Sequence, residues 1–342
     1  MKLTELRKKG KASYRKIGLL LLILCFFAIS APSSYLKAGQ TKNVLVLHSY
    51  HKGLGWTDRI TQGIESALHS SDQDIELYFE YMDTKRIHDA QYSQKLYELY
   101  RHKFRNRRFD VIISSDDHAF NFLLAHHQEL FPDTPIVFCG VNDFKDSMLV
   151  GHNLITGVVE SFDIKGANDV ALQLHPNAKE VFVIVDKTLS GRIVKEMVTK
   201  AIPYFKDVLK FTFLEDLDMS EVLERVKNLP TDSIVFLISL VIDKSGKTFS
   251  FQKSCALISQ NSSVPIYSHS DAYLGHGLVG GKLNCGDAQG KMAGEMALRV
   301  LHGEKVEDIQ VVKKSPNLYK FDYHQMQRFG IKLSSLPKGS TV

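Results

Sequence analysis

Residues 43–58 read NVLVLHSYHKGLGWTD, and the rest of the chain repeats the pattern found there. Four apolar residues, 44–47, end abruptly at the polar letters HSY, which is typical of a parallel strand buried on both faces. Apolar residues then recur every four positions from Trp56 to Leu68, which predicts a helix. Polar side chains just beyond such a strand lie where open α/β sheets bind ligands.

The strand–helix unit recurs along the chain in two series. The first series predicts strands at 75–81, 109–114 and 135–138, and the second at 180–185, 208–213, 233–239 and 264–268, with a helix between successive strands. This alternation predicts an α/β fold with two lobes, each a doubly wound parallel sheet, around a ligand cleft. We expect an N-terminal lobe of residues 43–155 and 275–331, a C-terminal lobe of 156–274, and a tail of 332–342.

The N-terminus indicates export. A positively charged stretch precedes the apolar run 17–29, and small residues follow, which is the order of a secretory signal. No clear cleavage site is present, so residues 1–38 are expected to be a signal peptide or an uncleaved membrane anchor. We therefore expect a periplasmic or otherwise extracytoplasmic protein, which is free if the leader is cleaved and tethered to the membrane if it is not.

The basic charge of the chain belongs mainly to this leader. The net charge is +5, and residues 1–38 contribute +7, which leaves −2 for the remainder. The charge balance therefore gives no global footprint for nucleic acid. A local basic cluster at 101–108 is open to a nucleic-acid interpretation, but its place at a predicted helix end favours a solvated helix terminus.

The chemistry-bearing residues do not form an enzymatic or metal signature. Three widely spaced cysteines, Cys139, Cys255 and Cys285, follow the leader, and buried thiols are the expected reading. The near histidine pairs lack a carboxylate at ligand spacing, so we expect no metal and no cofactor. Ser49 lacks the G-x-S-x-G elbow. Cys139, at a strand end, is the sharpest option for an enzyme, which stays the minority hypothesis.

The sequence resembles the ABC-transporter substrate-binding protein family with the type I periplasmic-binding fold. The resemblance rests on VLVLHSYHKGLGWTDRI (44–60), ISSDDHAFNFL (113–123), PIVFCGVND (135–143), ITGVVESFD (155–163), PIYSHSDAYLGHGLVGG (265–281) and GDAQGKMAGEMALRVLHGE (286–304). It covers residues 43–331. The motif HSYH…GWTD is similar to that of a subgroup that often forms the sensing half of signalling proteins. Since no kinase or cyclase domain follows, we expect a free or N-terminally tethered binding protein.

The resemblance implies a bilobal trap that closes on a small ligand. Strand ends then suggest the contacts. These are Ser49, Tyr50, Trp56, Ser115, Asp116, Cys139 and Asn142 in the first lobe, and Glu160, Asp186, Thr188, Ser239, Asp243 and Asp271 in the second. Carboxylates, hydroxyls and aromatic rings suit an amino-acid-like or cationic organic ligand. Two alternatives stay open at this point: Asp116 and Asp117 as helix caps, and Trp56 as a core residue.

We therefore expect a non-enzymatic solute-binding protein that works with an ABC permease and does not bind nucleic acid. The first alternative is a ligand sensor that feeds a membrane kinase or cyclase. The second is an enzyme that uses Cys139.

Overall fold

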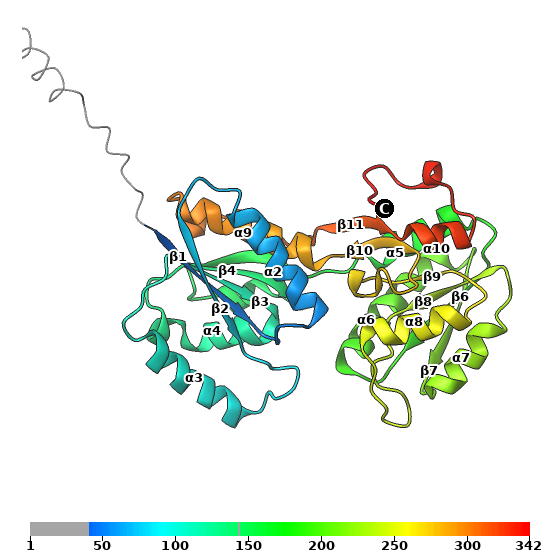
Figure 1. Ribbon diagram of the computed structural model, residues 1–342, viewed down its shortest axis with the longest axis horizontal. Coiled ribbons are helices and arrows are strands. Elements are labelled where there is room, and N and C mark those ends of the chain that lie inside the picture. Colours follow the sequence, from blue (N-terminus) through cyan, green and yellow to red (C-terminus); the bar gives the residue numbers. More distant parts are fainter. Residues whose placement is uncertain (1–40, 143) are drawn as a thin grey trace, which may run out of the picture. The chain divides into compact units, whose positions relative to one another are not determined.

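The structure is a computed structural model that describes residues 41–142 and 144–342, shown in Figure 1. The leader predicted for residues 1–38 lies outside the described residues. Among the described helices, none combines the length and apolar character that a membrane crossing needs.

The first sheet contains five parallel strands in the order β2-β1-β3-β4-β5. Its strands are β1 (Lys42–His48), β2 (Ile75–Tyr81), β3 (Val111–Ser115), β4 (Ile136–Val141) and β5 (Ile155–Val159). The helices α2 (Gly55–Leu68), α3 (Ala90–Phe104) and α4 (Asp116–Leu130) connect successive strands, and η1 (Asp146–Leu149) lies between β4 and β5.

Strand β1 shows why this sheet is buried on both faces. Val44 and Val46 pack on one face with α2 and α9 (Gly286–Leu301), whereas Leu45 and Leu47 pack on the other face with α3 and α4. All four side chains are at most 1% exposed. A strand covered by helices on both sides needs no polar alternation, which accounts for the continuous apolar run.

The second sheet has six strands in the order β11-β10-β9-β8-β6-β7. Its strands are β6 (Glu180–Val185), β7 (Lys210–Glu215), β8 (Ser233–Leu237), β9 (Ile266–Tyr267), β10 (Gly280–Asn284) and β11 (Asn317–Phe321). The helices are α5 (Ile164–Leu174), α6 (Leu189–Ala201), α7 (Met219–Lys227), α8 (Phe251–Asn261) and α10 (Tyr323–Arg328), with short 3-10 turns at η2 (Ile202–Phe205), η3 (Asp271–Tyr273) and η5 (Leu333–Ser335). The turn η4 (Val306–Asp308) lies against β5 of the first sheet instead. The predicted α/β fold with two parallel-sheet lobes is confirmed, and the edge strand β11 adds one antiparallel pairing.

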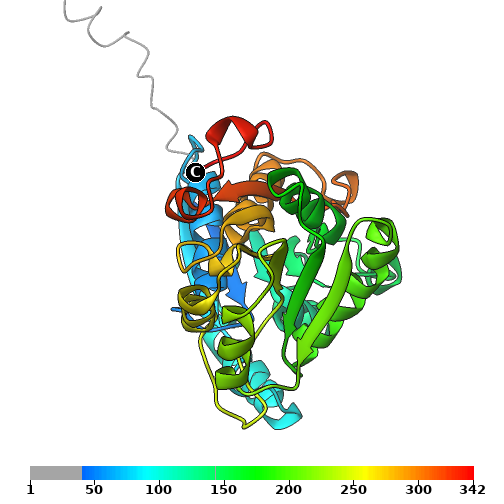
Figure 2. The same cartoon turned by 90° about the vertical axis from the view of Figure 1, so that its right-hand side faces the viewer.

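The predicted lobe boundaries are wrong in three places. Residues 156–159 belong to β5 of the first sheet, and β10 and β11 belong to the second sheet rather than the first. Gly280 permits the close pairing of β10 with β11, because a Cβ there would lie 2.2 Å from the carbonyl oxygen of Lys320. The tail also joins the second lobe, since Thr341 pairs with Lys320 beside β11, where the chain returns in Figure 2.

Helix α9 returns the chain to the first lobe and lies beside α2, as Figure 1 shows. Glycines make this approach possible. A Cβ at Gly290 would lie 2.0 Å from the carbonyl oxygen of Ile60, and one at Gly63 would lie 2.1 Å from that of Asp287. The two helix backbones are therefore closer than any side chain allows at these positions.

Candidate ligand-binding site

Three carboxylates gather beyond the carboxyl ends of β3 and β5, the two strands on either side of β4 in the first sheet. Asp116 and Asp117 follow β3, and Glu160 follows β5. Asn142, which follows β4 between them, donates from Nδ2 to Asp117 Oδ2 and to Glu160 Oε2, each at 3.2 Å. The parallel sheet thus brings residues that are far apart in sequence to one edge.

Asp116 occupies an unusual position. Its carboxylate is 2% exposed and accepts hydrogen bonds from Trp56 Nε1 at 2.8 Å and from Ser115 Oγ at 3.1 Å. Its backbone φ is +67°, a left-handed conformation that costs a non-glycine residue free energy. Burial raises the pKa of Asp116 to about 7, although both hydrogen bonds act in the opposite direction.

Burial also raises the pKa values of the other two carboxyl groups. Burial, followed by the charges of Asp116 and Asp117, raises the pKa of Glu160 well above its ordinary value. Burial also raises the pKa of Asp117. Within the described part of the chain, no Lys, Arg or His forms an ion pair with these three carboxylates. The desolvation of the ionised carboxylates is therefore poorly compensated, which favours their protonated forms.

Two aromatic side chains border the carboxylates. Trp56 is partly buried against the core of the first lobe while its indole nitrogen contacts Asp116, so it packs in the core and reaches the site. Burial and then the charges of Asp116, Asp117 and Glu160 raise the pKa of the Tyr50 hydroxyl well above its ordinary value. The exposed Lys85 ammonium lies 4.5 Å from the Tyr50 ring centroid.

Two other first-lobe candidates, Ser49 and Cys139, have structural roles. Ser49 Oγ donates to the carbonyl of Ser115 at 2.7 Å and accepts from the amide of Ala119 at 2.8 Å. Ser49 thereby caps α4. Ser115, the N-cap residue of α4, makes no side-chain cap hydrogen bond. The alternative that Asp116 or Asp117 is the side-chain cap is therefore wrong. Cys139 lies within β4 with no exposed surface, in the core with Val137. Cys139 is therefore a core residue rather than a ligand contact.

The second-lobe candidates Asp186, Thr188 and Ser239 come together, but they satisfy one another. Asp186 accepts from the hydroxyls of Thr188 at 2.6 Å and Ser239 at 2.9 Å, and from the amide of Val241 at 2.8 Å. Thr188 also caps α6. These bonds fix the loops after β6 and β8, and they leave little hydrogen-bonding capacity for a ligand.

Asp243 and Asp271 lie apart from that group. Asp243 binds the amides of Met219 and Lys247 and the hydroxyl of Ser245, which lowers its pKa and fixes a turn. Asp271 lies 3.1 Å from Arg59 Nε and belongs to an ionic network. Both predicted ligand contacts have structural partners instead.

One cluster has the donor types of a metal site, since Asp271, Cys285 and Asp287 bring ligand atoms within 4.8 Å of one another. The ammonium of Lys320 lies 2.8 Å from Asp287 and 3.9 Å from Asp271, so a cation of this chain already neutralises the carboxylates. Burial, above all, raises the pKa of the Cys285 thiol to about 12, which disfavours the thiolate that a metal needs.

Two residues near the carboxylates, Asp117 and Asn284, are absent from the site predicted from the sequence. In that prediction Asp117 had only the alternative role of a helix cap. Asn284, at the end of β10, donates from Nδ2 to Glu160 Oε1 at 2.6 Å. Two consecutive aspartates after a predicted strand could have indicated Asp117 from the sequence. No sequence pattern indicates that Asn284 contacts Glu160.

Enzyme chemistry finds little support in the described residues. Burial raises the pKa of the Cys139 thiol well above its ordinary value, opposite to what a nucleophile requires. His48 Nδ1 and Ser115 Oγ lie 2.8 Å apart, but neither side chain is exposed, and the other ring nitrogen of His48 faces the hydroxyl of Thr61 rather than a carboxylate. A substrate could not reach this pair. All three described cysteines are free and buried, as expected.

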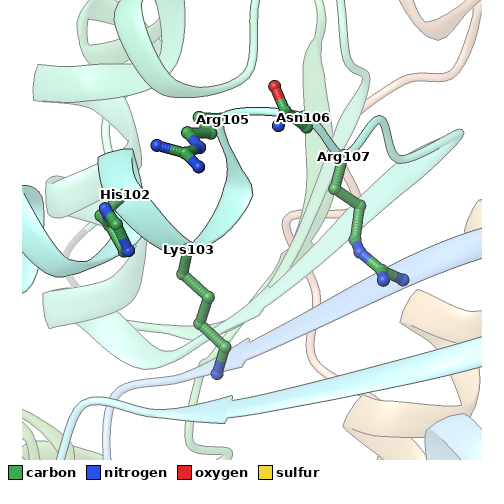
Figure 3. Close-up of a pocket in the computed structure, with 5 residues that line it drawn as sticks. All are labelled: His102, Lys103, Arg105, Asn106 and Arg107. Carbon is green, nitrogen blue, oxygen red and sulfur yellow. The ribbon is translucent and has the colours of Figure 1, made fainter.

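A surface hollow lies elsewhere, at the end of α3. It has a volume of about 340 Å³ and is lined by His102, Lys103, Arg105, Asn106 and Arg107, as Figure 3 shows. These residues are not neighbours of the carboxylate group in the sheet, because they precede β3 whereas Asp116 follows it.

Two parallel-sheet lobes with polar groups at the strand ends define the class of type I periplasmic binding proteins. Residues 51–335 match the family of ABC transporter substrate binding proteins, and the chain belongs to this family. Members of the family act outside the cytoplasm, bind small molecules and work with ABC permeases.

Solved structures agree in fold. The chain is similar to a ligand-free, open substrate binding protein with adhesive properties from Clostridium difficile, with a TM-score of 0.60, 16% identity and coverage of 88% of this chain and 99% of the other. It is also similar to an ABC domain in complex with L-Trp from Streptococcus pneumonia, with a TM-score of 0.56, 18% identity and coverage of 89% and 100%. A solute binding protein from Bacillus halodurans with bound myo-inositol gives a TM-score of 0.50, 14% identity and coverage of 80% and 92%. No curated protein matches the chain.

Proposed function

We propose that the chain is an extracytoplasmic solute-binding protein that captures a small organic ligand through its ammonium group and delivers it to an ABC importer. The supporting observation is the carboxylate group of Asp116, which is buried, and of Asp117 and Glu160, which are partly buried, without an ion-pair partner among the described residues. A ligand cation would supply the missing positive charge, and the binding free energy would include relief of this repulsion.

The surrounding groups fit the same ligand. Trp56 and Tyr50 offer aromatic surface for an organic cation, and cation–π contact of this kind contributes roughly 0.5–2 kcal/mol. An amino acid or a related amine combines the required features. The leader read from residues 1–38 would export the chain, in agreement with the family's place outside the cytoplasm.

A paired-ligand titration tests the ammonium requirement. Calorimetry at pH 8 compares amino acids and polyamines with their hydroxyl analogues, and with neutral sugars. We expect the amines to bind and the hydroxyl analogues to bind at least ~10-fold more weakly, since a hydrogen-bonded charge contributes about 1.5–3 kcal/mol. Equal binding of an amine and its hydroxyl analogue would contradict the proposal.

Variants locate the site. Glu160→Gln should weaken amine binding, whereas Asp72→Asn, which changes a carboxylate that is 95% exposed, should leave it unchanged. Amine affinity should also rise as pH passes through about 7, because the ligand needs Asp116 in its ionised form and burial sets its pKa there. An affinity that falls over this pH range would exclude Asp116 as the acceptor.

The delivery step needs its own measurement. Ligand-loaded protein should stimulate ATP hydrolysis by the cognate importer reconstituted in vesicles, and Glu160→Gln should reduce the stimulation at limiting ligand. Stimulation of a membrane kinase or cyclase without any effect on an importer would assign the sensor role instead.

A further inference from the structure

A loop rich in basic residues follows helix α3, and the dipole of that helix does not account for all of its positive charges. Five cationic residues occur within 101–108 of a chain whose net charge beyond the leader is −2. Arg101 and Lys103 lie in the last turn of α3, where they complement the helix dipole. Arg105, Arg107 and Arg108 lie beyond the helix end at Phe104, so the dipole does not account for them.

The loop is held firmly in place. Phe104 and Phe109, at its two ends, are each 5% exposed, and their ring centroids lie 5.3 Å apart in an edge-to-face contact. The residues 105–108 between these anchors are exposed. The buried rings therefore fix a short loop whose cationic side chains face solvent.

Two of these arginines lack partners. Lys103 pairs with Glu80, and the Arg107 guanidinium lies 4.5 Å from the Tyr78 ring centroid. In the described part of the chain, Arg105 and Arg108 make no ion pair, side-chain hydrogen bond or ring contact. Figure 3 shows Arg105 extending to the side of His102, while Lys103 and Arg107 reach toward strand β2. Of the cations that line the hollow, Lys103 is therefore paired with an acid, whereas Arg105 has no acidic partner among the described residues.

The loop lies at the same edge of the sheet as the point where the leader joins. Residue 110 follows the loop and its amide donates to the carbonyl of Asn43 at 2.8 Å. Asp110 also pairs with Lys42 of β1 at 3.0 Å. Residues 1–40, with their apolar run 17–29, connect directly to β1. The predicted leader is therefore covalently joined to the chain at this edge of the first sheet.

We propose that the basic loop 101–108 docks the first lobe on an anionic phospholipid surface, with the headgroup phosphates in the hollow of Figure 3. Exposed arginines match phosphate geometry, and juxtamembrane cations are attracted to anionic lipids by roughly 1 kcal/mol each. Docking holds the binding protein beside the permease. The attachment of the predicted leader beside Lys42 and the family's place outside the cytoplasm favour a membrane over nucleic acid.

The test is a vesicle partition assay with the full chain. Wild type, Arg105→Gln/Arg108→Gln and the control Lys200→Gln/Lys206→Gln are mixed with vesicles of phosphatidylcholine alone or with phosphatidylglycerol. The control removes two exposed cations from the second lobe. All three chains carry the same leader, so its contribution to binding cancels in the comparison.

We expect the loop variant to lose roughly 30-fold in partition to anionic vesicles at low salt, and the control to lose much less. Partition to phosphatidylcholine should be equal for all chains, and amine binding should be unchanged in the loop variant. An equal loss in the control, or a wild type without preference for anionic vesicles, would overturn the proposal. Duplex DNA binding that is as strong and as sensitive to the loop variant would overturn the lipid assignment.

Discussion

Asp116 combines a left-handed backbone, a buried carboxylate and acidic neighbours. Each of these features raises the free energy of the folded chain, and backbone strain of this kind costs about 1–3 kcal/mol. Strained and desolvated acids gather where a ligand repays the cost. These features support the proposal that a ligand cation balances the charge of Asp116.

Asp116→Asn should stabilise the unliganded protein at pH 8. Because the folded-state pKa is about 7 against an ordinary value of 3.8, the folded chain holds a proton that the unfolded chain releases between these values, and stability falls as pH rises through that window. Removing the charge should add ~1–4 kcal/mol at pH 8 and much less near pH 4. Urea denaturation at both pH values measures this. The same difference at both values would show that Asp116 does not titrate as described.

Ser49→Ala should destabilise the first lobe. Its hydroxyl is the acceptor for the Ala119 amide of α4, and the alanine variant would leave that buried donor without a partner. The expected cost is ~1–2 kcal/mol. Ser220→Ala, at an exposed position in the first turn of α7, serves as the control and should change the free energy of unfolding by less than ~0.5 kcal/mol. Equal effects of the two substitutions would refute the capping role.

Helices α2 and α9 form the closest helix contact of the first lobe. Gly286, Gly290 and Gly294 of α9 recur every four residues and face α2, where added Cβ atoms would meet the atoms of Trp56, Ile60 and Ala67. This contact attaches α9, from late in the chain, to the first sheet. The same helix follows β10 of the second sheet directly, so its packing fixes one of the connections between the lobes.

Gly290→Ala should therefore cost about 1–3 kcal/mol, although alanine favours helices, because its methyl group would force the two backbones apart. Lys291→Ala, at the adjacent exposed position, should change stability little. Thermal or urea unfolding distinguishes these outcomes. A Gly290→Ala variant as stable as wild type would mean that α2 and α9 separate easily.

Alternating charges link the two lobes. Arg59 on α2 contacts Asp271 in η3 at 3.1 Å, and Lys320 on β11 contacts Asp287 on α9 at 2.8 Å. A second polar network joins the connections, since Asn284 contacts Glu160 at 2.6 Å and accepts from Ser315 at 3.0 Å. Glu160 belongs both to this network and to the carboxylate group that we propose binds the ligand cation.

Arg59→Met should cost ~2–4 kcal/mol, because Asp271 is 3% exposed and would lose its nearer cation. The double substitution Arg59→Met/Asp271→Leu should recover most of this loss, since it removes both charges together. A double-mutant cycle by urea denaturation measures the coupling. Additive effects would show that the pair contributes nothing specific to holding the lobes.

The local pattern of the chain determined its fold class and the position of half the site. Continuous apolar runs such as 44–47 require burial on both faces, and polar residues after a parallel strand lie at one sheet edge, so Tyr50, Trp56, Asp116, Asn142 and Glu160 could be placed from the sequence. Family resemblance then predicted the binding role, which the match over residues 51–335 confirms at the level of the family.

Only the tertiary structure decided which polar groups satisfy one another. Asp186, Thr188 and Ser239 also follow strands, but their mutual hydrogen bonds consume their donors and acceptors. Cys139 belongs to the core, and β10 and β11 join the second sheet, because long-range pairing and packing place them there. A sequence pattern reports the face that a residue presents, whereas pKa shifts and hydrogen-bond partners depend on neighbours that the folded chain brings from distant positions.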